Sequence, residues 1–271
     1  MTATTPRPIE REEGRERFGD DPENYDSARP PYPSRLYDIL VERCLLHPGT
    51  RTFEIGPATG LATRELLARG AGPLVAIEPD RRLATHLSRW SVAAGEPVTV
   101  HRSTFESVRL RSGTFDLGVA ATSFHWLDQP RGLRKVHRLL RPGGWWAMWW
   151  NIFGDPLGYD AFHEATGEMM DRLTGSIGGD PVFALEFDTR TAQLAAAGLD
   201  SVEHEVIRWT HRFTPESMRA LYATFSNVTR LPRAEQEEIL DEIARVARED
   251  FGGIVDRTML TAIYTARKPG G

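Results

Sequence analysis

Apolar positions along the chain fall into short continuous runs that alternate with longer segments of helical periodicity. The runs predict five strands, at 52–55, 74–78, 98–101, 115–121 and 145–150. Helices are predicted around these runs, at 33–46, 61–69, 80–94 and 130–140. The run 115–121 is nearly all apolar, as is typical of a strand buried on both faces. Strands that alternate with helices in this way predict an α/β fold.

The regular order loosens after residue 151. Further helices are predicted at 158–173, 189–197, 215–225 and 233–250, further strands at 202–209 and 256–267, and a glycine-rich break at 175–179. Segments 152–188 and 211–252 are long for loops in a compact domain, and insertions of that size usually cover a site. We therefore predict a core formed by 19–151 and 189–271, with the two insertions as a helical cap.

The N-terminal residues carry no periodic pattern. Residues 1–18 mix Thr, Pro, Arg and Glu, which predicts a mobile tail. In the following segment, 18–33, several prolines are predicted to block a regular helix.

A glycine-bearing turn joins the first strand to the helix at 61–69. Gly56 and Gly60 tolerate positive φ and leave backbone N–H groups open to a ligand beside a helix N-terminus. Glu78 ends the second strand, at the same edge of a parallel sheet, where it can accept hydrogen bonds from a ribose diol. The turn and Glu78 together predict a nucleoside site.

The spacing of the turn distinguishes two nucleoside ligands. A dinucleotide turn reads G-x-G-x-x-G and holds a pyrophosphate, whereas the spacing here is Gly56-x-x-x-Gly60. Glu54, two residues before the first glycine, would repel a phosphate and attract an ammonium group. This favours S-adenosylmethionine, which has a ribose and an amino group but no phosphate.

Several segments match one family in the same order along the chain. They are Glu54 to Gly60 for the first motif, Ile77 to Asp80 for the second-strand acid, Phe115 to Val119 for the fourth strand, His125 to Leu127, and Leu140 to Gly144. With these the chain resembles the class I S-adenosylmethionine-dependent methyltransferases, in the small-molecule (methyltransferase type 11-like) branch. The resemblance covers about residues 20–150. It departs where Ala58 replaces the middle glycine and where Ser103 replaces an acid that often contacts the adenine amine.

The resemblance implies a Rossmann-like fold. Its seven-stranded, mostly parallel sheet would have the order 3-2-1-4-5-7-6, with strand 7 antiparallel and helices on both faces. It also implies S-adenosyl-L-methionine as cofactor and S-adenosyl-L-homocysteine as product. The cofactor-binding residues that it implies are Tyr25, Arg29, Glu54, Gly56, Pro57, Gly60, Glu78, Pro79, Thr104, Phe105, Ala120 and Ala121.

Three of these groups have specific expected roles by analogy with the family. Tyr25 and Arg29 would reach the methionyl arm and its carboxylate, although their segment could also be only a strap on the core. Phe105, or a backbone amide beside it, would line the adenine. The backbone carbonyl of Ala120 or Ala121 would accept a hydrogen bond from the ammonium group.

Aromatic residues follow the fourth and fifth strands. Phe124, His125 and Trp126 are expected to face the reaction chamber, and Trp150 and Asn151 to line the acceptor pocket, although core packing explains the aromatic residues equally well. His125 is the first candidate for a general base, with a Glu or Asp of the cap as the second. A structural histidine with satisfied hydrogen bonds is the alternative, and a neutral amine acceptor would need no base.

The composition of the chain limits the class of substrate and the cellular compartment that we expect. The net charge of −5 argues against a nucleic-acid substrate, and the single cysteine, Cys44, excludes an intramolecular disulfide. No signal peptide or long apolar run is evident, which predicts a cytoplasmic protein without membrane spans. Only Lys135 and Lys268 among the 33 basic residues are lysine, a bias typical of GC-rich bacterial coding. No metal-ligand cluster is evident.

The leading hypothesis is therefore methyl transfer from S-adenosylmethionine to an O, N or C nucleophile of a small molecule, with secondary metabolism as a candidate setting. A nucleoside-binding regulatory protein without catalysis is the alternative. A nicotinamide-dependent oxidoreductase is disfavoured by Glu54 and by the missing third glycine of the phosphate turn. The acceptor and the oligomeric state are not indicated by the sequence.

Overall fold

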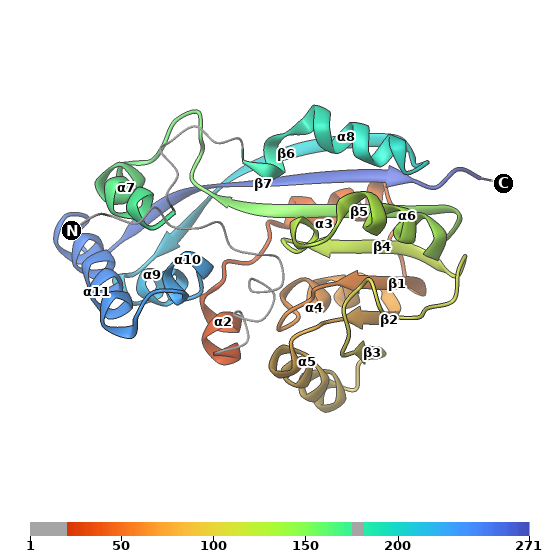
Figure 1. Cartoon of the computed structure of the whole chain (residues 1–271), viewed down its shortest axis with the longest axis horizontal. Helices are drawn as coiled ribbons and strands as arrows, with labels where there is room; N and C mark the ends of the chain where they lie inside the picture. Colours follow the sequence, from red (N-terminus) through yellow and green to blue (C-terminus); the bar gives the residue numbers. More distant parts are fainter. Residues whose placement is uncertain (1–20, 175–181, 271) are drawn as a thin grey trace. The chain divides into compact units, whose positions relative to one another are not determined.

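The computed structural model describes residues 21–174 and 182–270 (Figure 1). The predicted tail, 1–18, and the predicted glycine-rich break, 175–179, lie outside the described residues. The chain divides into two compact units. Unit 1 comprises Met1–Pro30, Ile152–Val182 and Arg208–Leu260, and unit 2 comprises Pro31–Asn151, Phe183–Ile207 and Thr261–Gly271. The predicted cap insertions overlap with unit 1 in sequence, and their covering of the site stays a prediction.

The strands form a seven-stranded sheet with the order β3-β2-β1-β4-β5-β7-β6. They are β1 (Thr50–Ile55), β2 (Ala71–Ile77), β3 (Val98–His101), β4 (Phe115–Ala121), β5 (Leu140–Phe153), β6 (Asp200–Phe213) and β7 (Val255–Arg267). The pairs β3–β2, β2–β1, β1–β4 and β4–β5 are all parallel. Strand β7 is antiparallel to β5, because the start of β5 is bonded to the end of β7 (Lys268 N–H to Gly144 C=O, 2.8 Å) and its end to the start of β7 (Gly154 N–H to Thr258 C=O, 2.9 Å). The predicted fold class and strand order are confirmed.

The described helices follow the predicted periodicity closely. They are α2 (Pro22–Ala28), α3 (Ser34–Glu42), α4 (Leu61–Ala68), α5 (Arg81–Ala94), α6 (Gln129–Leu139), α7 (Ala161–Thr174), α8 (Phe187–Ala196), α9 (Pro215–Tyr222), α10 (Ser226–Thr229) and α11 (Arg233–Glu249), with 3-10 turns η1 (Phe124–Trp126) and η2 (Phe183–Leu185). Among these residues, no helix is both long enough and apolar enough to cross a membrane.

Helix α2 corrects one prediction, that prolines would block a regular helix in 18–33. Pro22 occupies the first turn, where its missing N–H costs nothing, and the Asp21 side chain accepts a hydrogen bond from the Asn24 N–H (3.0 Å). The helix ends at Ala28, before Pro30. The prolines therefore bound the helix instead of preventing it.

Helices cover both faces of the sheet in unit 2. On one face, α3, α4 and α5 pack against β4 and β5 through a buried cluster that includes Leu36, Leu66, Leu87, Val119 and Trp149. Because side chains alternate along a strand, the neighbouring residues of β4 and β5 face the other way. There the ring of Trp146 packs against that of Phe124, which lies beside Gly132 of α6. Both faces of the central strands are thus buried, which explains their nearly all-apolar sequences.

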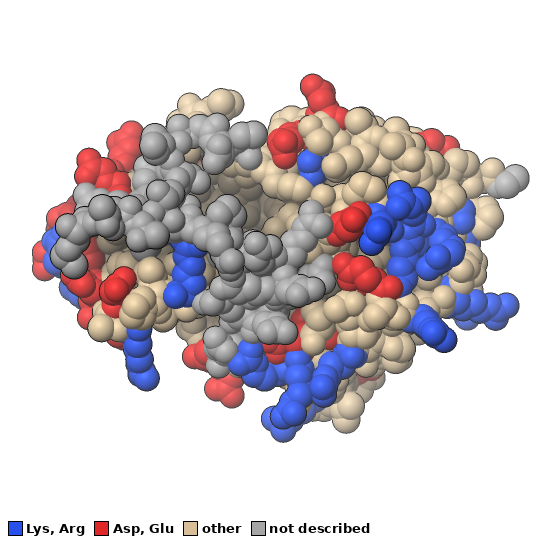
Figure 2. Space-filling model, in the orientation of Figure 1, with Lys and Arg blue, Asp and Glu red and all other residues tan. Residues whose placement is uncertain are grey.

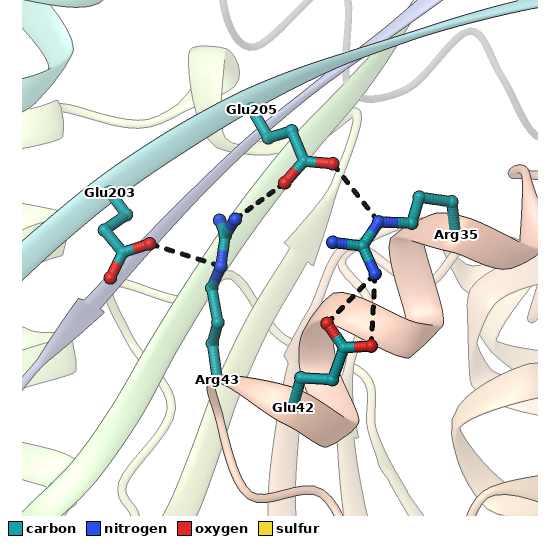
Figure 3. Close-up of polar contacts among 5 residues, drawn as sticks. All are labelled: Arg35, Glu42, Arg43, Glu203 and Glu205. Atoms are coloured by element: carbon teal, nitrogen blue, oxygen red, sulfur yellow. Dashed lines mark hydrogen bonds and ion pairs between the residues drawn. The ribbon is translucent and has the colours of Figure 1, made fainter.

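A charged network joins α3 to β6 (Figure 3). Arg35 contacts Glu42 (2.9 Å) and Glu205 (3.3 Å), and Arg43 contacts Glu205 (2.6 Å) and Glu203 (3.2 Å). These side chains are partly or largely exposed, so each pair adds little to the free energy of folding. The network orients α3 on β6, while the apolar face of the helix supplies the stability.

Unit 1 has its own hydrophobic core, which contains Phe162 of α7, Met218 of α9 and Ile243 of α11. Arg257 of β7 is 2% exposed and its guanidinium donates to Asp160 (2.8 Å) and to the Tyr222 hydroxyl (3.2 Å). A buried arginine is tolerated here because its charge has a carboxylate partner and further hydrogen bonds. The pair connects the segment before α7 with β7.

We expect Gly118→Ala to destabilise unit 2. A Cβ at Gly118 would lie 2.2 Å from Cζ of Phe53, whose ring stacks on Trp146 (6.1 Å between centroids) across β4. Overpacking of this kind costs about 1–3 kcal/mol in the free energy of unfolding, to be measured by urea denaturation. Gly158→Ala is the control, because a Cβ there meets no atom within 4 Å, and it should change stability by less than about 0.5 kcal/mol. Equal effects of the two substitutions would contradict this account of Gly118.

Candidate active site

The glycine turn lies at the carboxyl edge of the sheet, between β2 and β4. Ile55 at the end of β1 pairs with Ile77 of β2 and with Ala120 of β4, so the residues that follow all three strands meet at one edge. The Gly56 N–H donates to the Ile77 carbonyl (2.9 Å), and the Ser123 hydroxyl donates to the Ile55 carbonyl (2.5 Å).

Gly56 is required by both conformation and space. Its φ is +63°, and a Cβ would lie 2.7 Å from Cβ of Ser123. A side chain at this position would therefore push the loop after β4 away from the turn. Ala58, which replaces the family's middle glycine, also has a positive φ of +51°, a conformation that costs an L-residue about 1 kcal/mol.

Glu78 connects the end of β2 to this turn. Its Oε2 accepts a hydrogen bond from the Ala58 N–H (3.0 Å), and its Oε1 accepts one from the Asp80 N–H (2.9 Å). The residue is 4% exposed, and burial raises the pKa of its carboxyl to about 7. A carboxylate is thus held rigidly beside the turn, with lone pairs left to accept hydrogen bonds from a ribose diol.

Glu54 lies next to it in the core of the site and is 0% exposed. Its Oε2 accepts a hydrogen bond from the Thr63 hydroxyl of α4 (2.6 Å), while its Oε1 has no partner among the described residues. Burial raises the pKa of Glu54 to about 7, and the nearby Glu78 carboxylate acts in the same direction. A cationic ligand group close by would lower that pKa again.

The residues present fit S-adenosylmethionine. Within the described part of the chain, the hydroxyls of Thr59 and Ser103 are buried without a partner, as is Oε1 of Glu54. Buried polar atoms of this kind cost about 1–3 kcal/mol each when unsatisfied, and a ligand with hydroxyl and amino groups would satisfy them. Ser103 follows β3, where the family places the adenine amine.

The other residues near β3 are packed more tightly than the sequence suggested. Phe105 is 2% exposed, its ring stacks on that of Phe53 (6.1 Å), and its carbonyl accepts a hydrogen bond from Lys135 Nζ (2.5 Å). The Thr104 hydroxyl lies 3.0 Å from that of Ser107, within a turn. Adenine binding by Thr104 and Phe105 stays a prediction, and the packing of Phe105 favours a backbone contact.

His125 and Trp150 meet at the carboxyl ends of β4 and β5. The indole N–H of Trp150 donates to Nδ1 of His125 (2.9 Å), and the Trp126 ring lies 4.7 Å from the imidazole. Burial lowers the pKa of His125 to about 4, so the imidazole is neutral and carries its proton on Nε2. Phe124, by contrast, is 1% exposed and packs against Trp146 in the core.

Asn151 anchors the segment before α3. Its Nδ2 donates to the Pro31 carbonyl (3.3 Å), and its Oδ1 accepts a hydrogen bond from the Thr261 hydroxyl (2.6 Å). Tyr32, one residue further on, lies with its hydroxyl 3.0 Å from Oγ1 of Thr122. Both side-chain groups of Asn151 thus have structural partners, and its contact with an acceptor stays a prediction.

Phe183 and Arg190, which were not predicted as site residues from the sequence, lie beside these rings. Phe183 lies 5.3 Å from Trp150 and 6.0 Å from His125, and the guanidinium of Arg190 lies over the Phe183 ring (3.8 Å). The sequence contains a signal for Arg190, because its spacing from Phe187 and Leu194 places all three residues on one face of α8.

Tyr25 and Arg29 belong to unit 1. The guanidinium of Arg29 lies over the Tyr25 and Phe225 rings (5.1 Å from each centroid) and donates to the Thr224 carbonyl (3.0 Å). Nε of Arg29 is buried without a partner in the described part of the chain. Their contacts with the cofactor remain predictions.

Comparison with known proteins accounts for this geometry. Residues 53–148 match the family model described as a methyltransferase domain. The chain is a class I S-adenosylmethionine-dependent methyltransferase. The cofactor is S-adenosylmethionine, in agreement with the prediction.

The methyltransferase is similar to proteins of several organisms. An uncharacterized methyltransferase of Mycobacterium tuberculosis is 28% identical over 84% of each chain. A structure assigned as a type II methyltransferase of Anaeromyxobacter dehalogenans has a TM-score of 0.65 at 20% identity, covering 90% of this chain and 99% of that one. Phosphoethanolamine N-methyltransferase 2 of Haemonchus contortus, in complex with phosphomonomethylethanolamine and S-adenosylhomocysteine, has a TM-score of 0.53 at 13% identity, covering 87% and 52%. The two structures show the fold that the methyltransferase shares.

We expect Glu78→Ala to weaken binding of S-adenosylmethionine by about 1–3 kcal/mol, because the ribose loses a charged acceptor and the turn loses its bond to Glu78. Isothermal titration calorimetry measures the change. Glu238→Ala, which removes an exposed carboxylate of α11, is the control and should leave affinity within a factor of about 2. Unchanged affinity in Glu78→Ala would remove Glu78 from the site.

We also expect the free energy of unfolding to fall between pH 5 and pH 8. The folded-state pKa of Glu54 is about 7, above its ordinary value of 4.5, so the folded protein binds the proton more tightly. Stability from this group is present below pH 4.5 and is lost as pH rises through 7, on the order of 1 kcal/mol or more. Urea unfolding at both pH values should show a smaller decrease in Glu54→Gln than in the wild type. An identical decrease in the two proteins would show that Glu54 does not titrate in this way.

Proposed function

We propose that this methyltransferase transfers the methyl group to a small-molecule acceptor that binds beside His125 and Trp150. The observation that carries the proposal is the Trp150 to His125 hydrogen bond (2.9 Å) at the sheet edge that also holds the glycine turn. His125 is two residues from Ser123, which contacts the turn directly. An aromatic surface with one fixed polar group is typical of sites for small apolar or aromatic molecules.

The cofactor, when bound, supplies an electrophilic methyl group. Glu78 would hold the ribose, the turn from Gly56 through Pro57 to Gly60 would leave room for the nucleoside, and Pro79 would flank it. Glu54 and a carbonyl at Ala120 or Ala121 would fix the ammonium group. Tyr25 and Arg29 would hold the methionyl arm. The protein's task is then to align the acceptor with the methyl carbon and to exclude water.

His125 has a defined protonation state that limits its role. Because Nδ1 accepts the Trp150 N–H, the neutral ring presents Nε2–H as a donor. As a general base, His125 would have to take a proton at Nδ1 and lose its bond to Trp150. As a donor, Nε2–H would orient a polar group of the acceptor. We propose His125 as the residue that positions the attacking group, with proton removal as its second candidate role.

The charge of the chain supports a small acceptor over a nucleic acid. The chain has a net charge of −5. Figure 2 shows Lys and Arg side chains over α6 with Asp and Glu side chains close by on the same face. Nucleic-acid binding favours a continuous basic surface. A role in secondary metabolism, in a bacterium, is the setting that we propose.

The proposed function is tested by binding and turnover together. Titration with S-adenosylmethionine, S-adenosylhomocysteine and NAD should show binding of the first two and none of NAD. Incubation with methyl-labelled cofactor and a small-molecule extract should then label an extractable product. Cofactor binding without any labelled product would favour the alternative, a regulatory protein without catalysis.

We expect His125→Ala to retain cofactor affinity within a factor of about 2 and to lower kcat by roughly 10²-fold, the range of a positioned acid or base group. Labelled methyl transfer measures kcat. Trp150→Phe is the matched variant, because it keeps an aromatic ring but removes the indole donor, and it should lower kcat less. Full activity in His125→Ala would exclude both roles proposed for His125.

A further inference from the structure

Arg190 is a buried arginine whose hydrogen-bonding capacity is largely unused. It lies on α8 and is 4% exposed. Its Nη2 reaches Glu186 at 3.4 Å, whereas Nε and Nη1 are buried without a partner among the described residues. Burial lowers the pKa of this guanidinium. The group stays charged, because a guanidinium is not deprotonated in proteins.

The structural contacts of Arg190 do not account for these free donors. Its guanidinium lies 3.8 Å from the Phe183 ring centroid, which gives a cation–π interaction on one face. The contact with Glu186 is long for a charged hydrogen bond. Arg257, the other arginine of comparable burial among the described residues, donates to Asp160 at 2.8 Å and to Tyr222 at 3.2 Å. Arg190 therefore lacks the close partner that a buried charge requires.

The position of Arg190 connects it to the proposed acceptor site. Phe183 contacts Arg190 and also both residues of the proposed site, since the rings of His125 and Trp150 lie 6.0 Å and 5.3 Å from that of Phe183. The Tyr264 ring extends the same surface, with its centroid 6.3 Å from that of Trp150. Its hydroxyl donates a hydrogen bond to the Ala184 carbonyl (2.7 Å). Among these groups, Arg190 is the one that carries a positive charge.

We infer that the methyl acceptor carries a carboxylate, which Arg190 binds while the apolar part of the acceptor lies along Phe183 and Trp150. This inference rests on the proposed function and names its substrate class. With one face of the guanidinium covered by Phe183, an anion approaches in the plane of the group, where the N–H donors point. A planar carboxylate matches that geometry, and its charge replaces the missing partner of Arg190.

The probes for the test are benzoate, its neutral isostere benzamide, and phenyl phosphate as a different anion. Each is titrated into the wild-type protein saturated with S-adenosylhomocysteine, and binding is followed by ligand-observed NMR. Benzoate should bind about tenfold or more tightly than benzamide, because the amide lacks the charge, and more tightly than phenyl phosphate. This comparison uses only the wild type and does not depend on how any variant folds.

Arg190→Met should weaken benzoate binding by about tenfold or more and leave the affinity for S-adenosylhomocysteine unchanged. Arg267→Met is the matched control, because Arg267 also lies near an aromatic ring (5.8 Å from Trp145) but is exposed on β7, and it should leave benzoate binding unchanged.

The inference would be overturned by no binding of benzoate, by equal binding of benzoate and benzamide, or by equal benzoate affinity in the wild type and Arg190→Met. Tighter binding of phenyl phosphate than of benzoate would overturn the carboxylate assignment. Failure of the wild type to bind S-adenosylhomocysteine would instead contradict the proposed function, so the two failures are distinguishable.

Discussion

The site depends on the bond between the Glu78 carboxylate and the Ala58 amide (3.0 Å). It joins the turn after β1 to the end of β2, and the second oxygen of Glu78 holds the start of α5 through Asp80. One carboxylate therefore holds the turn after β1, the loop after β2 and the start of α5 in position. Burying that carboxylate is costly, as its raised pKa shows, and the two backbone donors offset part of the cost. The proposed ribose acceptor is thus held in place by the protein's own backbone.

The two buried acids of the site differ in how they are satisfied. Both oxygens of Glu78 accept backbone hydrogen bonds, whereas Glu54 has one hydroxyl partner, Thr63, and one oxygen without any among the described residues. The environment of Glu78 is rigid, while that of Glu54 lacks one donor. A ligand that brings a cationic donor would complete it. Two glutamates of the same type and similar burial are in this way suited to different parts of one ligand.

At the proposed acceptor site most of the side chains are aromatic rings. His125 lies on η1 after β4, and Trp150 lies on the adjacent strand β5. One hydrogen bond restrains the two side chains, and Phe183 joins them from a segment after α7. The hydrogen bond fixes the imidazole tautomer, so the packing of Trp150, and not the pH, determines that Nε2 carries the proton. The same surface ends at Arg190, where a charge lies against a ring. Apolar packing and a single cation together favour an acceptor with an apolar body and an acidic end.

The sequence by itself determined the order of the seven strands along the chain and of the helices between them, apart from α2 and α10, together with the glycine turn and the acid after β2. It could do so because parallel strands bring their carboxyl ends to one edge, so residues that follow successive strands are neighbours in any such sheet. Only the tertiary structure decided that Phe105 packs on Phe53, that Trp150 occupies Nδ1 of His125, and that Arg190 lies against Phe183. The first two contacts join residues far apart in sequence and depend on which side chains the faces of the sheet bring together, while the third depends on how the chain bends between η2 and α8. The periodicity of a segment predicts whether it forms a helix or a strand, but it does not predict which residues that element will contact.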